Sequence, residues 1–540
     1  MTALLEIREL TIELPPGADR RHAVEGVSLR VDRGRTLCMV GESGSGKSLA
    51  AAAIVRLLPS PRLRIVGGSI LLEGRDTLVM SPSELLDIRG GRVGYIFQDP
   101  LSCLNPLERI GRQVREVLDR HGWPGDRAAR VLELLADVGL PSPSSMVHSY
   151  PWQLSGGQRQ RVMIAIALAA NPALLIADEP TTALDVTTQA QILRLLRELQ
   201  SRHGLGLLLI THDFGVVAEM ADDVAVLKDG KLIESGLRNA VLGSPQEEYT
   251  RRLLAAVPPL VPRSPRPPAA PLLQSWNLSK TFKASGPWWR RAAAVPAVAG
   301  VALSVGCGET VAVVGESGSG KSTLARLLAR LTDCDTGQAR LAGVADDYLA
   351  LRASELAPLR RAVQMVFQDP FASLNPRHTV GYSIAMGPIA NGTPPEQAML
   401  EARELLARVR IDPKSADRYP NEFSGGQRQR IVIARALAMK ARLLIADEPV
   451  SALDVSVQAE ILDLLEEIQA RDDLGMIFIT HDLRVASRMA DRIVVMKTGR
   501  VVEAGSTRQV LTAPEHPYTR ELLAAIPRMD AEAWAAARSR

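Results

Sequence analysis

Short apolar runs alternate with longer helical stretches along the chain. Residues 36–40 (TLCMV) form an apolar run that ends in a glycine-rich turn, and the Ala/Leu-rich stretch 49–58 after it holds no Gly or Pro until Pro59. This order predicts a strand, a loop and a helix. The runs 174–177 and 207–210 are too short for helices and apolar throughout. We therefore expect them to be strands of a parallel sheet that is buried on both faces.

The segment between residues 99 and 155 has a different, helical pattern. In front of a glycine, apolar residues recur at the spacing i, i+3, i+4 and i+7 that one face of a helix requires: Val131, Leu134, Leu135 and Val138. The pattern therefore predicts a helical insert that separates two parts of an α/β core.

The second half of the chain repeats the motifs of the first half. The sequence GESGSGKS at 41–48 returns at 315–322, and further motifs follow in the same order: FQDP at 97–100 and 367–370, SGGQRQR at 155–161 and 424–430, LIADEP at 175–180 and 444–449, ALDV at 183–186 and 452–455, and ITHD at 210–213 and 479–482. Solenoid repeats run about 20 to 50 residues, so a repeat of this size indicates two whole domains.

The join between the two domains is rich in proline. Such a segment has few backbone donors and favours extended polyproline geometry, which is typical of a short, semi-stiff linker. The prolines stand at positions 258, 259, 262, 265, 267, 268 and 271. We predict a first domain at 1–262, a linker at 263–271 and a second domain at 272–540.

Both copies of GESGSGKS match the GxxxxGKS spacing of a phosphate-binding loop. Glycines let backbone N–H groups close around phosphate oxygens, the lysine neutralises charge, and the serine hydroxyl reaches a Mg²⁺ ion. A purely structural glycine loop is the alternative, but two copies in equivalent contexts argue against it. The residues expected at the phosphates are Gly41, Glu42, Ser43, Gly44, Ser45, Gly46, Lys47 and Ser48 (the first P-loop) and Gly315, Glu316, Ser317, Gly318, Ser319, Gly320, Lys321 and Ser322 (the second P-loop).

Paired carboxylates follow an apolar run in each half. Asp178 and Asp447 end these runs, where a carboxylate can hold Mg²⁺ or its waters. Glu179 and Glu448 come next and point differently, which suits a general base for an attacking water. Alone, each pair fits a solvated turn equally well. The P-loop upstream of both pairs favours the nucleotide interpretation.

Two further residue types recur at the ends of strands. His212 and His481 lie in Thr-His-Asp after an apolar run. A lone histidine there is more often structural, but the chain has only eight and two occupy equivalent places, so we expect both in the catalytic sites. Gln98 and Gln368 are weaker evidence, since a polar residue often ends a strand.

A second kind of phosphate-binding element opens a helix in each half. Small residues at a helix start expose free N–H groups and the positive end of the dipole. A flexible turn is the alternative. Two such elements per half make sense if one of them serves the nucleotide of the other half. The residues are Ser155, Gly156, Gly157 and Gln158, and Ser424, Gly425, Gly426 and Gln427.

Composition excludes several classes of protein. The 540 residues carry 64 Lys+Arg against 60 Asp+Glu, which implies no general field for binding nucleic acid. No stretch of about 18 apolar residues spans a membrane, and Glu6 interrupts what a signal peptide would need. The cysteines form no CxxC pair, so we expect reduced thiols in a cytosolic setting: Cys38, Cys103, Cys307 and Cys334.

In order and spacing, the repeated motifs resemble the nucleotide-binding cassette of ABC ATPases over nearly all of both halves. The resemblance implies an α/β fold of two tandem P-loop NTPase (ABC-type) cassettes, each with a RecA-like core and an α-helical insert, and ATP and Mg²⁺ as cofactors. It also implies that the cassettes sandwich two ATP molecules head to tail. One site then combines Lys47, Ser48, Gln98, Asp178, Glu179 and His212 with Ser424, Gly425 and Gly426, and the other combines Lys321, Ser322, Gln368, Asp447, Glu448 and His481 with Ser155, Gly156 and Gly157.

The resemblance also implies a role for each residue of these sites. The metal ligands are expected to be Ser48, Gln98 and Asp178 in one site and Ser322, Gln368 and Asp447 in the other. The catalytic residues are expected to be Glu179, His212, Glu448 and His481. Because both sites keep the lysine, aspartate, glutamate and histidine, we expect both to hydrolyse ATP.

A narrower resemblance comes from the segments 102–106 (SCLNP) and 373–376 (SLNP) and from 516–520 (HPYTR). These are similar to the dipeptide/oligopeptide (and nickel) importer ATPases, with the usual two subunits fused. That family implies two separate transmembrane permease subunits, which dock near the segments after Gln98 and Gln368, and an extracytoplasmic substrate-binding protein. It implies no nucleic acid, and a peripheral place on the cytoplasmic face of the bacterial inner membrane.

Several alternatives to peptide import stay open. Nickel, glutathione and peptide antibiotics are other substrates of such importers. A soluble twin ATPase acting on ribosomes or DNA is the main rival class, and an exporter ATPase is a third. A short proline-rich linker and the lack of cysteine pairs argue against the rival class.

The sequence departs from the family pattern in four places. Leu14 stands where the second half has Phe282, the position at which an aromatic ring usually stacks on adenine. Leu49 stands where the second half has Thr323, so one hydroxyl near the phosphates is missing. Neither half has the Cys-rich tail of some relatives, and we expect no iron-sulfur cluster. The second half also inserts a loop with Trp288-Trp289-Arg290-Arg291, which we expect to be a packed surface hairpin, with a contact to a partner as the alternative.

Overall fold

The computed structural model describes residues 3–182, 184–263, 269–283, 294–451 and 453–527. In the first half the strands are β1 Leu5–Glu13, β2 His22–Val31, β3 Thr36–Val40, β4 Arg64–Leu72, β5 Arg75–Asp76, β6 Val93–Ile96, β7 Leu174–Asp178, β8 Gly206–Ile210, β9 Asp223–Lys228 and β10 Lys231–Leu237. The helices are α1 Lys47–Ile54, α2 Pro82–Ile88, α3 Pro100–Cys103, α4 Ile110–Arg120, α5 Arg127–Asp137, α6 Pro143–Met146, α7 Gly156–Leu168, α8 Val186–His203, α9 Phe214–Met220, α10 Arg238–Gly243 and α11 Glu248–Ala256.

The second half repeats this order with small differences. Its strands are β11 Pro271–Lys283, β12 Ala294–Gly306, β13 Thr310–Val314, β14 Thr336–Leu341, β15 Val363–Val366, β16 Leu443–Asp447, β17 Gly475–Thr480, β18 Arg492–Lys497 and β19 Arg500–Ser506. Its helices are α12 Lys321–Leu328, α13 Ala357–Ala362, α14 Pro370–Ser373, α15 Val380–Ala390, α16 Pro395–Arg408, α17 Gly425–Leu437, α18 Val455–Asp472, α19 Leu483–Met489, α20 Thr507–Thr512 and α21 Pro517–Ala524.

Each half contains one mostly parallel sheet and one antiparallel sheet. The parallel sheets have the strand orders β10-β9-β3-β8-β7-β6 and β15-β16-β17-β13-β18-β19. Their central strands are buried along their whole length, as β3, β7 and β8 show in the first half. The antiparallel sheets have the orders β2-β1-β4-β5 and β12-β11-β14. This is the α/β core that the apolar runs predict, and the carboxyl ends of the parallel strands carry the site residues.

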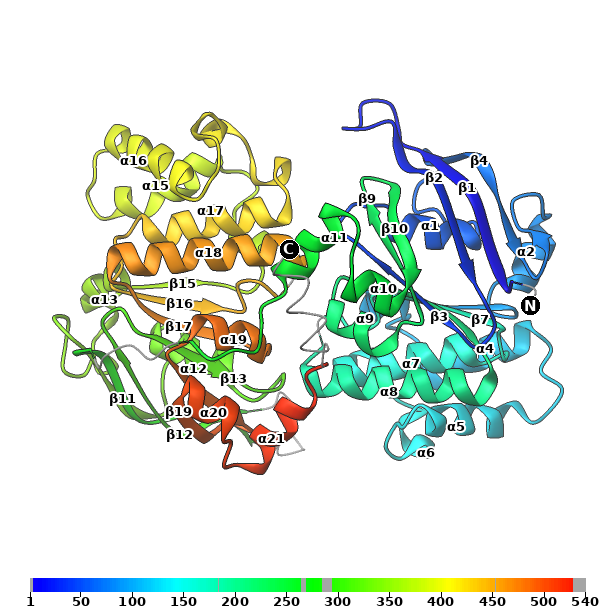
Figure 1. Cartoon of the computed structure of the whole chain (residues 1–540). Coiled ribbons are helices and arrows are strands. Elements are labelled where there is room, and N and C mark those ends of the chain that lie inside the picture. Colours follow the sequence, from blue (N-terminus) through cyan, green and yellow to red (C-terminus); the bar gives the residue numbers. More distant parts are fainter. Residues whose placement is uncertain (1–2, 183, 264–268, 284–293, 452, 528–540) are drawn as a thin grey trace.

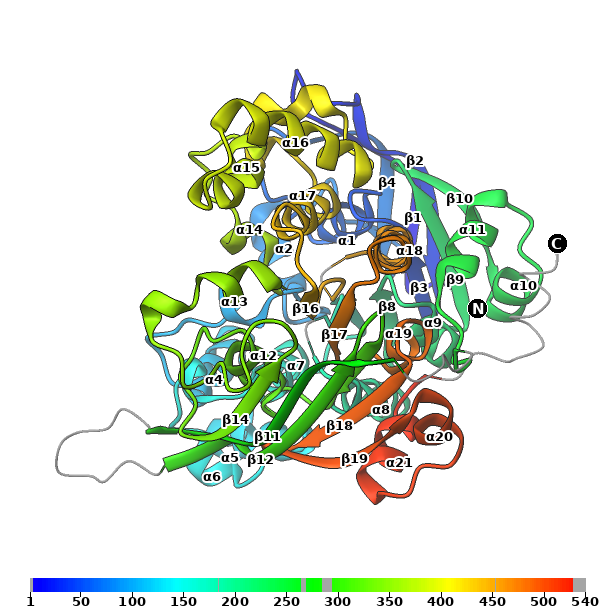
Figure 2. The same cartoon turned by 90° about the vertical axis from the view of Figure 1, so that its left-hand side faces the viewer.

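The two halves lie side by side and point in opposite directions (Figure 1). The insert helices α15 and α16 of the second half lie at the top of this view, whereas α5 and α6 of the first half lie at the bottom. Figure 2, seen from the side of the second half, keeps the same arrangement. The C-terminal helix of each half contacts the long helix of the other half, α11 with α18 and α21 with α8. The halves are therefore arranged head to tail.

Most of the predicted elements are confirmed, and one helix boundary is wrong. The runs 174–177 and 207–210 lie in β7 and β8, and the helical pattern before Gly139 lies in α5. The helix predicted at 49–58 instead ends at Ile54. The reason is that Arg56 adopts a left-handed backbone conformation with φ of 50°, which no helix continues through.

The join between the halves is packed against the second half over its first residues. The Ser487 hydroxyl on α19 donates to the Pro259 carbonyl at 3.0 Å, and the Arg263 guanidinium donates to the Met489 carbonyl at 3.0 Å. β11 already begins at Pro271. Residues 264–268 of the predicted linker lie outside the described residues, and the domain boundaries stay a prediction.

The predicted hairpin around Trp288 and Trp289 also lies outside the described residues. The strands on both sides of it, β11 and β12, pair with each other in antiparallel register, with Lys283 opposite Ala294.

Candidate active site

Each P-loop is a turn between a buried strand and a helix whose backbone only glycine allows. Gly41 and Gly46 follow β3 with φ of 148° and 98°. A Cβ on Gly41 would collide with the Leu227 carbonyl, and one on Gly46 would lie 2.5 Å from the Ala23 carbonyl. The glycines therefore let the backbone pass close to its own neighbours, in a tight turn of the kind that closes around phosphate.

The P-loop lysines lie buried and hold the loops in shape. Lys47 is 6% exposed, and its Nζ donates to the carbonyls of Gly41 and Glu42, both at 2.8 Å. Lys321 makes the same two bonds to Gly315 and Glu316. Burial lowers the pKa of the Lys47 ammonium, although the carboxylates of Glu179 and Asp178 oppose this effect. Lys47 Nζ also donates to Ser45 Oγ at 3.2 Å. A buried cation that has only neutral hydrogen-bond partners among the described residues fits an anionic ligand such as phosphate.

The serine after each lysine meets the aspartate that ends the neighbouring strand. Ser48 Oγ donates to Asp178 Oδ1 at 2.9 Å, and Ser322 Oγ donates to Asp447 Oδ1 at 3.0 Å. Burial raises the pKa of Asp178, and the hydrogen bond from Ser48 works against that increase. A hydroxyl beside a carboxylate is the donor set that Mg²⁺ takes together with nucleotide phosphates. These residues fit a Mg²⁺ ion, and their role as its ligands stays a prediction.

Glu179 and Glu448 each lie next to a glutamine and a histidine. Gln98 Nε2 donates to Glu179 Oε2 at 2.9 Å, and Gln368 Nε2 donates to Glu448 Oε2 at the same distance. His212 Nδ1 lies 3.4 Å from Glu179 Oε1. The structure thus places both glutamines on the candidate general bases. Their predicted role as metal ligands stays a prediction.

The glutamate and the histidine of each site shift each other's pKa. Burial by itself raises the pKa of Glu179, but the hydrogen bond and the charge of His212 outweigh it and lower this pKa to about 2. Burial by itself lowers the pKa of His212, and the bond and charge of Glu179 overcome that effect and raise it. The pKa of Glu448 is lowered and that of His481 is raised for the same reasons. Both glutamates are therefore ionised at neutral pH, as a base must be.

The small-residue segments begin helices α7 and α17. Ser155 Oγ accepts the Gln158 N–H at 3.3 Å, and Gln158 Oε1 accepts the Ser155 N–H at 3.0 Å, which is a capping box. Ser424 and Gln427 repeat this geometry. Among the residues that the structure describes, the hydrogen bonds of Ser155 and Ser424 stay within these first turns. The expected contact between each segment and the ATP of the other half stays a prediction.

The P-loops are contacted across the interface by residues that the sequence did not single out. Ser456 Oγ donates to Glu42 Oε1 at 2.5 Å, and Thr187 Oγ1 donates to Glu316 Oε1 at 2.6 Å. The Ser43 N–H also donates to Asp454 Oδ2 at 3.4 Å. The hydroxyls lie in the first turns of α18 and α8, just after the repeated ALDV. That repeat was the available signal, but it says nothing about which half is contacted.

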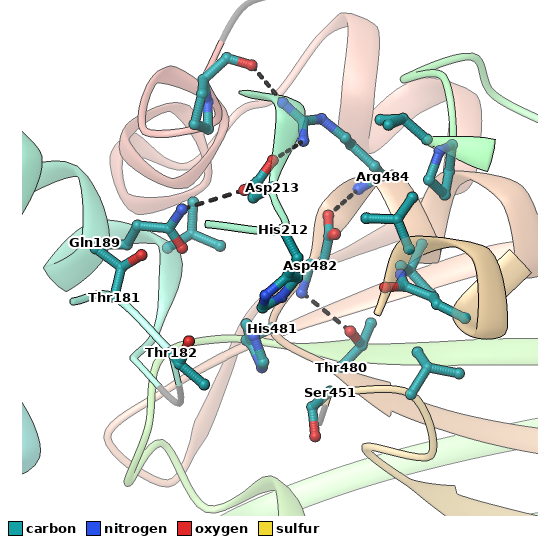
Figure 3. Close-up of a pocket in the computed structure, with 18 of the residues that line it drawn as sticks. Thr181, Thr182, Gln189, His212, Asp213, Ser451, Thr480, His481, Asp482 and Arg484 are labelled. Atoms are coloured by element: carbon teal, nitrogen blue, oxygen red, sulfur yellow. Dashed lines mark hydrogen bonds and ion pairs between the residues drawn. The ribbon is translucent and has the colours of Figure 1, made fainter. Parts of the chain in front are cut away.

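The two histidine loops line one cavity between the halves (Figure 3). Its volume is about 130 Å³. His212 and His481 both line it, with Thr182 and Ser451 beside them. A second cavity, of about 330 Å³, joins Ser317 of the second P-loop to residues of both halves, including Asp185, Gly425 and Glu448.

The surroundings expected for adenine differ between the halves. Phe282 is 47% exposed, and Lys280 Nζ lies 5.9 Å from the centre of its ring. Leu14 packs instead against the core of the first half. There the Arg20 guanidinium donates to the Gly44 carbonyl of the P-loop and lies 3.4 Å from Asp229. No sequence pattern pointed to Arg20, because a surface arginine has many uses.

A tyrosine contacts the strand-end aspartate of the first half. Tyr95 on β6 donates to Asp178 Oδ2 at 3.4 Å. The second half has Met365 at the equivalent place. After the P-loops, Leu49 packs against the core and Thr323 is half-buried.

None of the described helices combines the length and the apolar character that a membrane-spanning segment needs.

Two family models match parts of this chain. The family described as "ABC transporter" matches residues 24–182 and 298–451, and the family "Oligopeptide/dipeptide transporter, C-terminal region" matches residues 502–539. The chain is 44% identical over 532 residues to the "Peptidoglycan transport ATP-binding protein YejF" of Agrobacterium fabrum, covering 97% of this chain and 96% of that protein.

A second relative is similar to the same extent. The "Glutathione import ATP-binding protein GsiA" of Salmonella typhimurium is 44% identical over 562 residues, which cover 98% of this chain and 90% of that protein. Among solved structures, a dimeric post-hydrolysis state of an ATP-binding cassette bound to ADP and Pi is 31% identical, with a TM-score of 0.39, and covers 43% of this chain and 98% of that chain.

Proposed function

This chain belongs to the ABC transporter family of ATP-binding cassettes, and we propose that it hydrolyses ATP at two composite sites to drive the import of peptides. The observation that carries the composite sites is the contact of each P-loop with the start of the long helix of the other half, Ser456 to Glu42 and Thr187 to Glu316. Such contacts need the head-to-tail arrangement. They make each P-loop sensitive to the position of the other half.

Each site is proposed to use residues of both halves. Lys47 and the backbone of the first P-loop bind the phosphates of one ATP, and Ser424, Gly425 and Gly426 complete that site from the other half. In the second site, Lys321 acts with Ser155, Gly156 and Gly157. Serine and glycine N–H groups at a helix start suit the far side of a phosphate.

Mg²⁺, when bound, neutralises phosphate charge and polarises the bond that breaks. Ser48 and Asp178 are proposed to hold it in the first site, and Ser322 and Asp447 in the second. Glu179 accepts a proton from the attacking water, since its lowered pKa keeps it ionised. His212 holds Glu179 in place through the 3.4 Å contact.

Both sites are proposed to be catalytic, because each has the same lysine, aspartate, glutamate and histidine in the same contacts. The test is turnover of ATP by the purified chain with Glu179→Gln, Glu448→Gln or both. We expect each single change to lower turnover and the pair to abolish it. If only one of the two changes lowers turnover, the sites are not equivalent in chemistry.

Peptides are proposed as the imported substrate. The support is the match of residues 502–539 to the oligopeptide/dipeptide C-terminal region and the names of the relatives. Peptidoglycan fragments and glutathione differ in size, but both contain amino acids joined by amide bonds. A peptide-type substrate is what these relatives share. Nickel and peptide antibiotics are the alternatives.

Uptake measurements decide the substrate. Cells that express the Lys47→Ala/Lys321→Ala chain are compared with cells that express the unmodified chain, for labelled dipeptides, oligopeptides, glutathione and nickel. We expect the variant to lose peptide uptake. Unchanged uptake of every peptide together with lost nickel uptake contradicts the proposal.

The partners are proposed to be two separate permease subunits and an extracytoplasmic substrate-binding protein, with the chain bound peripherally at the cytoplasmic face of the inner membrane. The exposed apolar side chains beside the two glutamines support this docking, for example Leu101 at 57% and Phe371 at 63% exposure. The rival class acts on ribosomes or DNA. Co-sedimentation with permease-containing membranes, but not with ribosomes, is the expected result.

A further inference from the structure

The two loops that carry the histidines meet at the interface, but their sequences differ. His212 is followed by Asp213-Phe214-Gly215, and His481 is followed by Asp482-Leu483-Arg484. In both loops the aspartate caps the next helix: Asp213 accepts the Gly215 N–H, and Asp482 accepts the Arg484 N–H, each at 2.7 Å. Backbone and cap are thus alike, and the side chain at the third position distinguishes the loops.

Arg484 extends from the second half to the first. Its Nη1 lies 3.7 Å from Asp213 Oδ1, and its Nη2 donates to the carbonyl of Pro527 (Figure 3). The Arg484 side chain is 11% exposed. Gln189 Nε2 on α8 donates to the other oxygen of Asp213 at 3.3 Å. The Asp213 carboxylate therefore joins α9, α8 and the α19 arginine of the other half.

The first half leaves room for this arginine because it has glycine at the matching position. A Cβ on Gly215 would lie 2.7 Å from Arg484 Nη2 and 3.0 Å from Asp213 Oδ1. No ion pair within the described ranges joins Asp482 to the first half. The ion pair between Arg484 and Asp213 is therefore asymmetric: an arginine of the second half contacts the loop that carries His212 in the first half.

We propose that Arg484 is a positioning residue of the first ATP site. By holding Asp213 it fixes the loop that presents His212 to Glu179, whose Oε1 lies 3.4 Å from His212 Nδ1. Hydrolysis at the first site therefore depends on how the second half is seated, and the second site lacks the matching support. This inference rests on the proposed function, since it needs His212 and Glu179 to act in a catalytic site.

The test compares the two sites within the full chain. Glu448→Gln leaves the first site as the active one, and Glu179→Gln leaves the second. We expect Arg484→Gln to lower kcat about fivefold or more in the Glu448→Gln chain, with an unchanged KM for ATP because Arg484 does not contact the P-loop. In the Glu179→Gln chain kcat should change less than about twofold. An equal fall in both chains, or no fall in either, overturns the proposal.

A second measurement does not depend on turnover. In the chain with ¹³C-labelled histidines, Arg484→Gln should shift the ring resonance of His212 and leave that of His481 in place, with assignments from His212→Gln and His481→Gln. Equal shifts of both, or no shift of His212, contradict the proposal even if the single-site chains turn over too slowly to compare.

Matched variants separate positioning from loss of folding. Gly215→Ala displaces the Arg484 side chain without removing its charge, and alanine is the better helix former. We expect it to reproduce the effect of Arg484→Gln, with no further effect in the double variant. Arg484→Lys should restore part of the activity.

Arg488→Gln is the control, because Arg488 lies on the same helix and pairs with Asp463 and Glu466 inside the second half. It should change neither site. Turnover by the unmodified chain and its loss in the Glu179→Gln/Glu448→Gln chain test the ATPase itself, so failure of the Arg484 proposal is distinguishable from failure of the proposed function.

Discussion

The Ser456 hydroxyl donates a 2.5 Å hydrogen bond to the Glu42 carboxylate, although 414 residues separate them along the chain. Glu42 also donates its backbone N–H to the Tyr249 hydroxyl at 3.3 Å, at the start of α11. The second P-loop has the same two contacts, Glu316 with Thr187 and with Tyr518. The second residue of each P-loop thus contacts both the C-terminal helix of its own half and the long helix of the other half.

We predict that Ser456→Ala weakens ATP binding at the first site. A hydrogen bond to a charged acceptor contributes about 1.5 to 3 kcal/mol, less when water reaches it, so a loss of about fivefold in affinity is expected. Isothermal titration with ATP in the Glu179→Gln chain measures it. Thr187→Val should act on the second site instead.

A double-mutant cycle of Ser456→Ala with Glu42→Gln checks the cause. Because the two side chains bond to each other, the second change should add little once the first is made. Fully additive effects would show that the two residues act independently.

We predict that His212 titrates above the ordinary histidine range in the nucleotide-free chain. The bond and charge of Glu179 raise its pKa, and the same pair lowers the pKa of Glu179 to about 2. In Glu179→Gln, burial remains without the charge, so the pKa of His212 should fall below that of the unmodified chain. A ¹³C NMR titration measures both values, and equal values contradict the assignment.

The same pair makes a pH-dependent contribution to stability. Because the folded-state pKa of His212 is raised, this contribution is complete below the unfolded pKa of about 6.5. It is lost as the pH rises through the folded pKa. The difference in Tm between the unmodified chain and His212→Gln should therefore shrink from pH 6 toward pH 9, and a difference that grows with pH falsifies the sign.

Much of the site is predictable because parallel strands place their ends at one edge of a sheet. Ser48 and Asp178 follow β3 and end β7, so order along the chain was enough to bring them together. The family resemblance put Glu179 and His212 in one site, and Glu179 Oε1 lies 3.4 Å from His212 Nδ1.

Contacts that depend on the seating of the halves were not predictable. Thr187 and Ser456 have no periodic or compositional signal, and Arg484 differs from Gly215 by a substitution that is unremarkable in a helix. The bond from Gln98 to Glu179 depends on a rotamer, which a motif does not specify. Sequence patterns fix which strand ends meet, but they do not fix side-chain direction or docking.

We predict unequal adenine binding. Base stacking on an aromatic ring contributes about 1 to 3 kcal/mol in nucleic-acid complexes, so Phe282→Leu should weaken ATP binding at the second site about fivefold or more. Leu14→Phe should strengthen the first site only if the new ring leaves the core position that Leu14 now fills. Arg20→Ala should weaken the first site, since Arg20 lies on its P-loop. Titration with ATP and with inorganic triphosphate separates base from phosphate contacts, and equal losses for both ligands in Phe282→Leu contradict stacking.

We predict that Mg²⁺ binding at the first site weakens as the pH falls. Burial raises the pKa of Asp178, and the Ser48 hydroxyl that opposes this effect is the other proposed ligand. A metal binds the deprotonated carboxylate, so protons compete with it as the pH falls. The Mg²⁺ concentration for half-maximal turnover should therefore be higher at pH 6 than at pH 8.

Ser48→Ala should raise this Mg²⁺ concentration at both pH values, because one oxygen ligand is lost and the buried carboxylate loses a bond that favours its charged form. Asp126→Asn, at the capping position of α5 far from the P-loops in sequence, is the control. A Mg²⁺ requirement that is the same at both pH values and in Ser48→Ala places the metal elsewhere.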